Sequence, residues 1–213
     1  VGGSRGEGGN DYNTAVLVTP NGDFYWYDKV HLAPFGEYIP FESWLPFLRN
    51  IAFGGVSAGT EQRIFQFNGK AIGPLICFEV LFAPMAGRLR GMGAQALAVI
   101  TNLGWFGASN VTAQELEIAR FRAIENRISL LHCGNTGISG MFDPSGRFIP
   151  VHAIFYGNDV RFYDPERIEP AMVYGRRMAG VFDVPPPAPI PGLPWRMALP
   201  ALTVLLAAME LRP

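Results

Sequence analysis

The fold is decided by residues 70–101, which read KAIGPLICFEVLFAPMAGRLRGMGAQALAVIT. This stretch predicts an apolar strand over Lys70–Cys77, a short helix within Val80–Gly91 and a second buried strand over Ala94–Thr101. Helix and strand alternate along this part of the chain. Such alternation favours a layered α/β fold over an all-β fold.

The segments on either side extend this pattern. Strands are predicted at residues 14–19 and 23–28 around a Pro-Asn-Gly turn, and at residues 63–67 and 70–77 around an Asn-Gly turn. A capping box formed by Thr112 and Glu115 predicts a helix that runs to about Arg127. Three further strands are expected near residues 128–132, 137–142 and 147–151. Residues 32–60 form a long connection rich in proline and aromatic residues, and connections of this length usually serve as lids or binding loops.

The composition excludes several classes of protein. The 213 residues include 17 Lys+Arg and 18 Asp+Glu, so the chain lacks the basic excess of a nucleic-acid-binding protein. Hydrophobic residues make up 49% of the chain and charged residues 16%, and the mean hydropathy is +0.16, so we expect part of the surface to face something apolar. Two cysteines, Cys77 and Cys133, and three scattered histidines form neither a disulfide scaffold nor a zinc pattern. No metal or cofactor is expected.

Three side chains are candidates for a catalytic site built around a cysteine. Cys77 ends an apolar strand at an expected strand-to-helix elbow, where a helix N-terminus favours the thiolate, although an inert buried cysteine is the alternative. Lys29 follows a strand, where its ammonium can stabilise a thiolate or an oxyanion. Glu37 lies in an apolar loop and needs a cationic partner unless it is a solvated loop charge.

Five motifs spread over roughly residues 10–150 resemble the nitrilase (carbon–nitrogen hydrolase) superfamily. Within it, the sequence is most similar to the apolipoprotein N-acyltransferase branch, because of its Lys-x-His-Leu-x-Pro-Phe-Gly-Glu run and its Trp-Phe-Gly motif. The motifs are Lys29-Val30-His31-Leu32 with Pro34-Phe35-Gly36-Glu37, Ile76-Cys77-Phe78-Glu79, Asn102-Leu103-Gly104-Trp105-Phe106-Gly107, Ala119-Arg120-Phe121-Arg122-Ala123-Ile124-Glu125 and Asn135-Thr136-Gly137.

The resemblance implies a partial nitrilase-like α-β-β-α sandwich on the periplasmic face of the bacterial inner membrane. It also implies acyl transfer from a phospholipid, through a cysteine thioester, to the amine of a diacylated apolipoprotein. By motif match Cys77 is the nucleophile, Lys29 the oxyanion-stabilising cation, Glu37 the residue that orients this lysine and the amine, and Glu79 a further acidic catalytic position. Substrate-binding residues are expected at Phe78, Trp105 and Phe106 and in the aromatic loop at Trp44 and Phe47, although that loop can instead close over the core.

Three segments are expected along the chain: a partial carbon–nitrogen hydrolase domain over residues 1–183, a Pro-rich linker over 184–194 and a short hydrophobic C-terminal helix over 195–213. The apolar run Met197–Met209 is thirteen residues long, whereas a membrane span needs about 20, so length favours a core helix and the resemblance favours membrane association. The family's general-base glutamate precedes these motifs, and Glu7, in a glycine-rich stretch expected to be flexible, is no substitute. We expect an incomplete chain that is inactive alone.

Two other functions remain open. A soluble nitrilase-type amidase would pass its acyl group to water. A catalytically dead remnant would serve as a binding module, an alternative left open by Phe78, where the family commonly has Tyr, and by the missing general-base glutamate. The chain also has His132 and Cys133 where the family usually has an Arg-Ala-Thr run.

Overall fold

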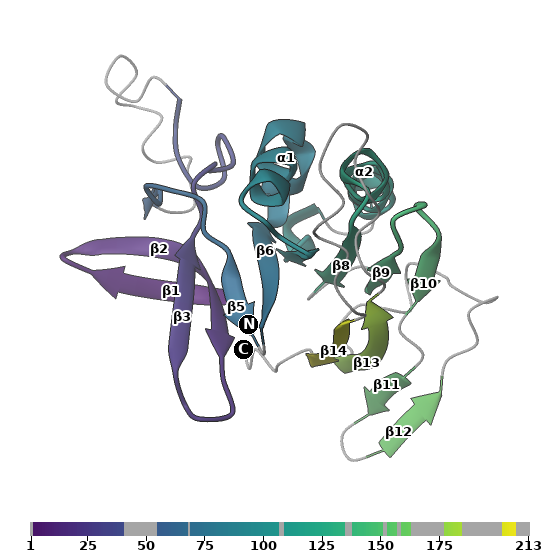
Figure 1. The fold of residues 1–213 in the computed structure, drawn as a ribbon. Helices are drawn as coiled ribbons and strands as arrows, with labels where there is room; N and C mark the ends of the chain where they lie inside the picture. The colour runs from purple at the N-terminus through teal and green to yellow at the C-terminus, as the bar shows by residue number, and fades with distance from the viewer. Residues whose placement is uncertain are drawn as a thin grey trace.

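The computed structural model describes residues 2–40, 55–67, 69–106, 109–134, 138–150, 153–156, 159–162, 177–184 and 202–207. Its central element is a six-stranded sheet (Figure 1). Strands β6, β7 and β8 are parallel to one another, whereas β5 pairs antiparallel with β6, β9 with β8 and β10 with β9. The strand order is β10 (Phe148–Pro150), β9 (Gly140–Phe142), β8 (Ser129–Gly134), β7 (Ala96–Thr101), β6 (Lys70–Ile76) and β5 (Phe65–Phe67). The predicted layered α/β architecture is confirmed.

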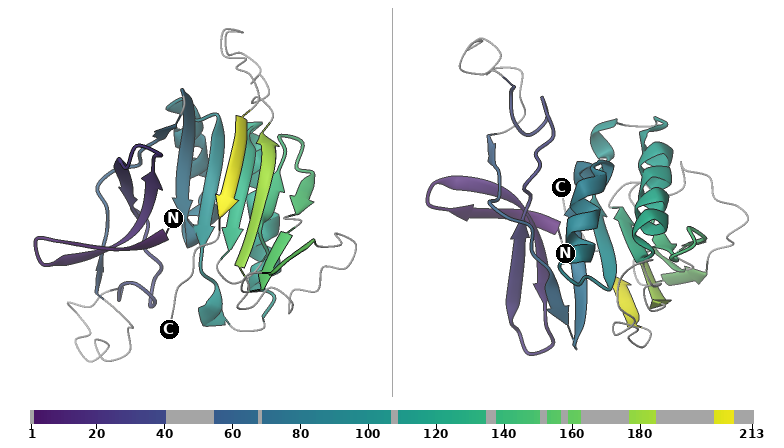
Figure 2. Two further views of the ribbon diagram at one scale, coloured as in Figure 1. Left: turned by 90° about the horizontal axis from the view of Figure 1, so that it is seen from below. Right: turned by 45° about the horizontal axis from the view of Figure 1, so that its top comes forward.

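Two helices connect the parallel strands and cover one face of this sheet (Figure 2). They are α1 (Ala83–Gly91) and α2 (Val111–Asn126), the latter ended by Arg127 in the left-handed conformation. Side chains of a strand alternate between its two faces, so Leu75 and Leu97 meet Leu89 and Ala119 of the helices in one buried cluster. Leu116, Ala119 and Ala123 of α2 lie in this cluster, so they mark the face of the helix that packs on the sheet.

The opposite face of the six-stranded sheet packs against a second sheet. Ile72 and Ile76 of β6 share a buried cluster with Ala15 and Tyr27. This second sheet contains β1 (Gly2–Glu7), β2 (Asn10–Val18), β3 (Phe24–Asp28) and the short β4 (Val56–Ser57). The described residues thus supply one helical layer and two sheets of the expected sandwich.

Two local predictions near these elements are wrong. The glycine-rich start of the chain is strand β1, which pairs with β2 because Gly8 and Gly9 take positive φ values of 59° and 81° in a two-residue hairpin turn. The capping box does not form, because α2 begins at Val111 after Asn110 and the Glu115 side chain is turned into the protein interior. The helix predicted within residues 80–91 is divided into the 3₁₀ helix η2 (Cys77–Leu81) and α1.

The predicted C-terminal helix is not what the structure shows. Residues 202–207 form β14 (Leu202–Ala207), which pairs antiparallel with β13 (Arg177–Val184) in a sheet that also holds β11 (Ala153–Tyr156) and β12 (Asp159–Phe162). A short apolar run suits a buried strand as well as a helix, and here strand pairing satisfies its backbone groups. The rest of 195–213 and residues 185–194 of the predicted linker lie outside the described residues. Within the described part of the chain, no helix has the length and apolar character needed to cross a membrane.

Candidate active site

Cys77 lies at a sharp bend where β6 ends and η2 begins. Its φ is 51°, a left-handed value that is uncommon outside glycine and that costs a non-glycine residue about 1–3 kcal/mol when the surroundings impose it. The bend is held by a hydrogen bond of 2.8 Å that the Ile76 backbone N–H donates to Glu79 Oε2. The thiol is therefore presented at the carboxyl end of a central parallel strand, where α/β proteins place their ligand sites.

Lys29 and Glu37 form a buried ion pair. Lys29 Nζ lies 2.6 Å from Glu37 Oε2, and the residues are only 1% and 7% exposed. The same oxygen accepts the Ala33 N–H at 2.7 Å, and Asn13 Nδ2 donates to Glu37 Oε1 at 2.7 Å. These contacts compensate the carboxylate charge fully and fix the direction in which the lysine points.

The surroundings of Cys77 raise its pKa above the ordinary value of a thiol. Burial is the largest cause, and the charge of Glu115 adds to it. Hydrogen bonding to the Thr101 side chain, the charge of Lys29 and the Phe78 backbone N–H lower the pKa, but they do not offset burial. The thiolate expected from the helix terminus is thus not the resting form, because the sulfur is desolvated at the elbow. The charge of Lys29 is one of the groups that act on the Cys77 sulfur.

Glu79 ties the Lys29 segment to the Cys77 elbow. It is 0% exposed, and its Oε1 accepts the Tyr27 hydroxyl at 2.7 Å and the backbone N–H groups of Val30 and His31 at 2.8 and 3.0 Å. Burial raises the pKa of Glu79 while these hydrogen bonds oppose the rise, and burial together with Glu79 raises the pKa of Tyr27. With four donors bound, the carboxylate fixes the distance between two chain segments.

The predicted substrate-binding residues fall in different places. The rings of Phe78 and Phe106 lie 5.8 Å apart, and Trp105 belongs to the short helix η3 (Gly104–Phe106). Trp44 and Phe47 lie outside the described residues. Glu7 is paired with Arg5 in the β1 strand.

Four residues near the site were not predicted from the sequence to belong to it: Asn13, Thr101, Glu115 and His132. Thr101 ends β7 and Asn13 lies in β2, where a polar residue in a strand gives little signal. The position of Glu115 could have been predicted to face the interior. It precedes Ala119 by four residues and Ala123 by eight, so all three lie on the same buried face of the helix. Within the described residues no group of three or more His, Cys, Asp or Glu side chains is placed to hold a metal ion.

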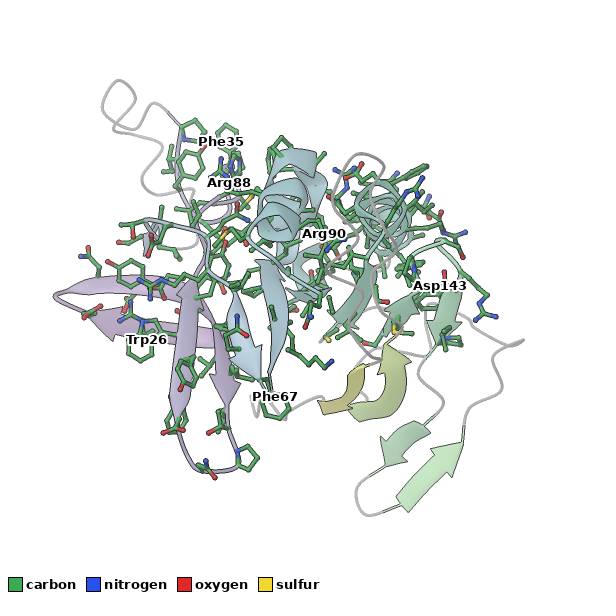
Figure 3. All side chains as sticks on the ribbon, viewed as in Figure 1. Trp26, Phe35, Phe67, Arg88, Arg90 and Asp143 are labelled. Carbon is green, nitrogen blue, oxygen red and sulfur yellow. The ribbon has the colours of Figure 1, made fainter. Side chains whose placement is uncertain are left out.

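An exposed aromatic surface lies beside the ion pair. Phe35 and Tyr38, on the loop that carries Glu37, are 63% and 41% exposed, and Phe35 projects at the edge of the molecule in Figure 3. The loop is shaped by the Phe35 N–H donating to the Tyr38 carbonyl at 2.7 Å. The loop therefore buries a charge on one side and presents apolar rings on the other.

Comparison with known proteins gives consistent relatives. The chain is 38% identical over 157 residues to an apolipoprotein N-acyltransferase of Aquifex aeolicus and 36% identical over 146 residues to one of Geobacter metallireducens. These matches cover 71% and 67% of this chain but only 34% and 28% of the relatives, so the chain spans about a third of the length of the curated relatives it matches.

Solved structures share the fold. An amidase mutant from Nesterenkonia sp. AN1 matches with a TM-score of 0.52 at 24% identity, covering 69% of this chain and 55% of the amidase. A carbon-nitrogen hydrolase from Helicobacter pylori G27 matches with a TM-score of 0.53 at 17% identity, covering 70% and 54% of the two chains. The family model described as carbon-nitrogen hydrolase matches residues 1–154. That match spans the β1–β4 sheet, the six-stranded sheet and the cysteine elbow, and on its strength this chain belongs to the carbon–nitrogen hydrolase family.

Proposed function

We propose that this chain carries the acyl-transfer site of an N-acyltransferase, which moves an acyl chain from a phospholipid to the N-terminal amine of a diacylated apolipoprotein. The observation that supports this most is the buried Lys29–Glu37 pair beside a cysteine at a strained elbow. The relatives that bear the name apolipoprotein N-acyltransferase support the choice of reaction.

In the first half-reaction the Cys77 sulfur attacks the ester carbonyl carbon of the phospholipid. A C–S bond forms and the carbonyl π electrons move to the oxygen. The ester C–O bond then breaks, and the leaving alkoxide receives the proton that the thiol gave to a general base. In the family pattern this base is a glutamate that precedes the lysine motif. Formation of a thioester divides one difficult transfer into two easier ones.

In the second half-reaction the amine nitrogen attacks the thioester carbon. A C–N bond forms, the C–S bond breaks, and a proton from the amine returns to Cys77 through the same base. In both steps negative charge develops on the carbonyl oxygen. The Lys29 ammonium is the cation we assign to that charge, because it is held in place by Glu37 and needs no rearrangement during the reaction.

Glu37 and Glu79 take different roles in this proposal. Glu37 positions the Lys29 ammonium, and we assign to it the orientation of the incoming amine as well. Glu79 is a positioning residue, since its hydrogen bonds to Tyr27, Val30, His31 and Ile76 engage both of its oxygens. It holds the Lys29 segment against the Cys77 elbow.

The exposed rings of Phe35 and Tyr38 support an apolar substrate. Aromatic side chains are favoured at the interface between lipid and water, where a phospholipid donor would approach. We therefore propose that the site faces the bacterial inner membrane from the periplasmic side, with Phe106 and Phe78 beside the acyl chain.

Mass spectrometry of the full-length protein tests the reaction. After incubation with phospholipid we expect an acyl adduct on the Cys77 peptide, and after addition of a diacylated lipopeptide we expect its transfer to the peptide amine. Cys77→Ser is the control for the adduct. Release of the acyl group to water at the same rate with or without lipopeptide would support an amidase-like reaction, and the lack of any adduct would support a remnant without activity.

A further inference from the structure

A second buried pair of titratable residues is formed by Glu115 and His132. Glu115 of α2 and His132 of β8 are 4% and 0% exposed, and His132 Nε2 lies 3.6 Å from Glu115 Oε2. The other ring nitrogen, His132 Nδ1, is 2.8 Å from the Ile138 carbonyl oxygen. A carbonyl oxygen only accepts hydrogen bonds, so Nδ1 carries a hydrogen.

The hydrogen on Nδ1 limits which protonation states allow a hydrogen bond between His132 and Glu115. If His132 were neutral with its hydrogen on Nδ1, its Nε2 would be an acceptor, and so would an ionised Glu115 Oε2. Both atoms are buried, and in the part of the chain that the structure describes neither has a hydrogen-bond partner, because the 3.6 Å between them is longer than a hydrogen bond. Two facing acceptors would leave two buried polar atoms unsatisfied, which is strongly unfavourable. A proton placed between Nε2 and Oε2, which face each other at 3.6 Å, would relieve this conflict.

Thr101 connects this pair to the nucleophile. Its hydroxyl donates to Glu115 Oε1 at 3.1 Å. In the parallel pairing of β6 with β7, Ile76 lies opposite Ile100, so Thr101 ends β7 at the same edge where Cys77 follows β6, and the Thr101 side chain lowers the pKa of Cys77. A threonine hydroxyl has one hydrogen and two lone pairs, so while it donates to Glu115 it can accept the Cys77 S–H. The four groups thus follow one another from β8 to α2, β7 and the elbow.

We propose that Glu115 and His132 are positioning residues that share one buried proton and, through Thr101, set how readily Cys77 ionises. The inference rests on the proposed function only in taking Cys77 as the reactive thiol. The charged groups that face Cys77 are Lys29, from the end of β3, and Glu115, from α2. The charge of Glu115 opposes formation of the thiolate, and a proton shared with His132 would offset part of that charge.

The test measures the rate at which iodoacetamide alkylates Cys77 in the full chain as a function of pH, with the Cys77 peptide quantified by mass spectrometry. In His132→Gln the carboxylate of Glu115 loses its proton partner, so we expect the profile to move to higher pH and the rate at pH 7 to fall roughly threefold to tenfold. In Glu115→Gln the charge is removed and the amide can donate to His132, so we expect the profile to move to lower pH. The double variant should resemble Glu115→Gln.

Glu117→Gln is the matched control, because Glu117 lies on the exposed side of the same helix and pairs with Arg120. A purely structural role would change both single variants in the same direction or leave both profiles in place, and either result would overturn the proposal. If His132→Gln fails to fold, ¹⁵N NMR of the wild-type histidines decides: we expect a protonated or hydrogen-bonded Nε2 at His132, and a free, unbonded Nε2 would refute the shared proton. Alkylation requires no acyl donor. The alkylation profiles can therefore refute the role of Glu115 and His132 without refuting acyl transfer, and an acyl-transfer assay can fail without refuting that role.

Discussion

Replacing Glu37 by Gln tests whether the Lys29 charge is as completely buried as the structure shows. Glutamine has nearly the shape of glutamate, and its oxygen can accept from Lys29 and Ala33 as Oε2 does. The Asn13 amide, which donates to Oε1, can turn and offer its oxygen to the new NH₂ group. The hydrogen bonds are therefore retained in number, and what is lost is the negative charge.

The expected cost follows from leaving a lysine that is 1% exposed without a counter-ion. Removing one member of a buried ion pair destabilises a protein by about 3–5 kcal/mol. Pulse proteolysis in urea on the full-length protein measures this loss. The double variant Lys29→Met with Glu37→Gln should recover at least half of it, because no unpaired charge remains buried.

Glu61→Gln is the matched control, since the Glu61 side chain is well exposed and pairs with Arg63 on the surface. Its expected effect is within about 0.5 kcal/mol. A loss below about 1 kcal/mol for Glu37→Gln, or a double variant as unstable as the sum of the two single variants, would mean that Lys29 reaches solvent and that the buried pair does not exist.

Three further outcomes are expected. Lys29→Met should lower the rate of acyl transfer to Cys77 by about 10²–10³-fold in a single-turnover assay, because a preorganised oxyanion partner is lost; a rate within a factor of two of wild type would remove Lys29 from the mechanism. Glu79→Gln should destabilise the protein by about 1–3 kcal/mol in the urea assay, since the amide NH₂ would face a backbone donor in place of an oxygen; an unchanged midpoint would contradict its role as a tether. Burial raises the pKa of the Cys133 thiol to about 12, so the folded state holds the thiol proton more tightly than the unfolded state does. The stability that this proton contributes is lost as pH rises from about 9 to 12. Cys133→Ala should therefore flatten the plot of unfolding free energy against pH in that range.

Much of the fold followed from local pattern. The alternation of apolar strands and helices across residues 70–134 depends on interactions near in sequence, and the structure matches it. Cys77, Lys29 and Glu37 were selected by motif. The structure pairs Lys29 with Glu37, and Glu79 binds backbone groups of Val30, next to Lys29, and of Ile76, next to Cys77. These features are encoded by runs of neighbouring residues, which is the information that a single sequence carries best.

The errors occurred where a distant partner decides the outcome. Glu115 fits a capping box locally, but Thr101 and His132, far away in the chain, draw its carboxylate inward. The apolar run at 202–207 suits a helix until β13 offers it backbone partners. The resting charge of Cys77 was misjudged for the same reason: the helix terminus is local, whereas burial is produced by residues from both sheets.

The raised pKa of Cys77 is consistent with the proposed catalysis rather than opposed to it. Lys29 is already paired with Glu37, so part of its field at the sulfur is cancelled and the thiol stays protonated at rest. A carbonyl oxygen bound beside Lys29 gains negative charge only as the sulfur attacks, and at that moment the ammonium is already oriented toward it. Only interactions that are stronger in the transition state than in the ground state accelerate a reaction. A lysine that stabilised the resting thiolate fully would lower the energy of the ground state as well, so a protonated Cys77 beside a paired Lys29 leaves more of the lysine's interaction energy for the oxyanion.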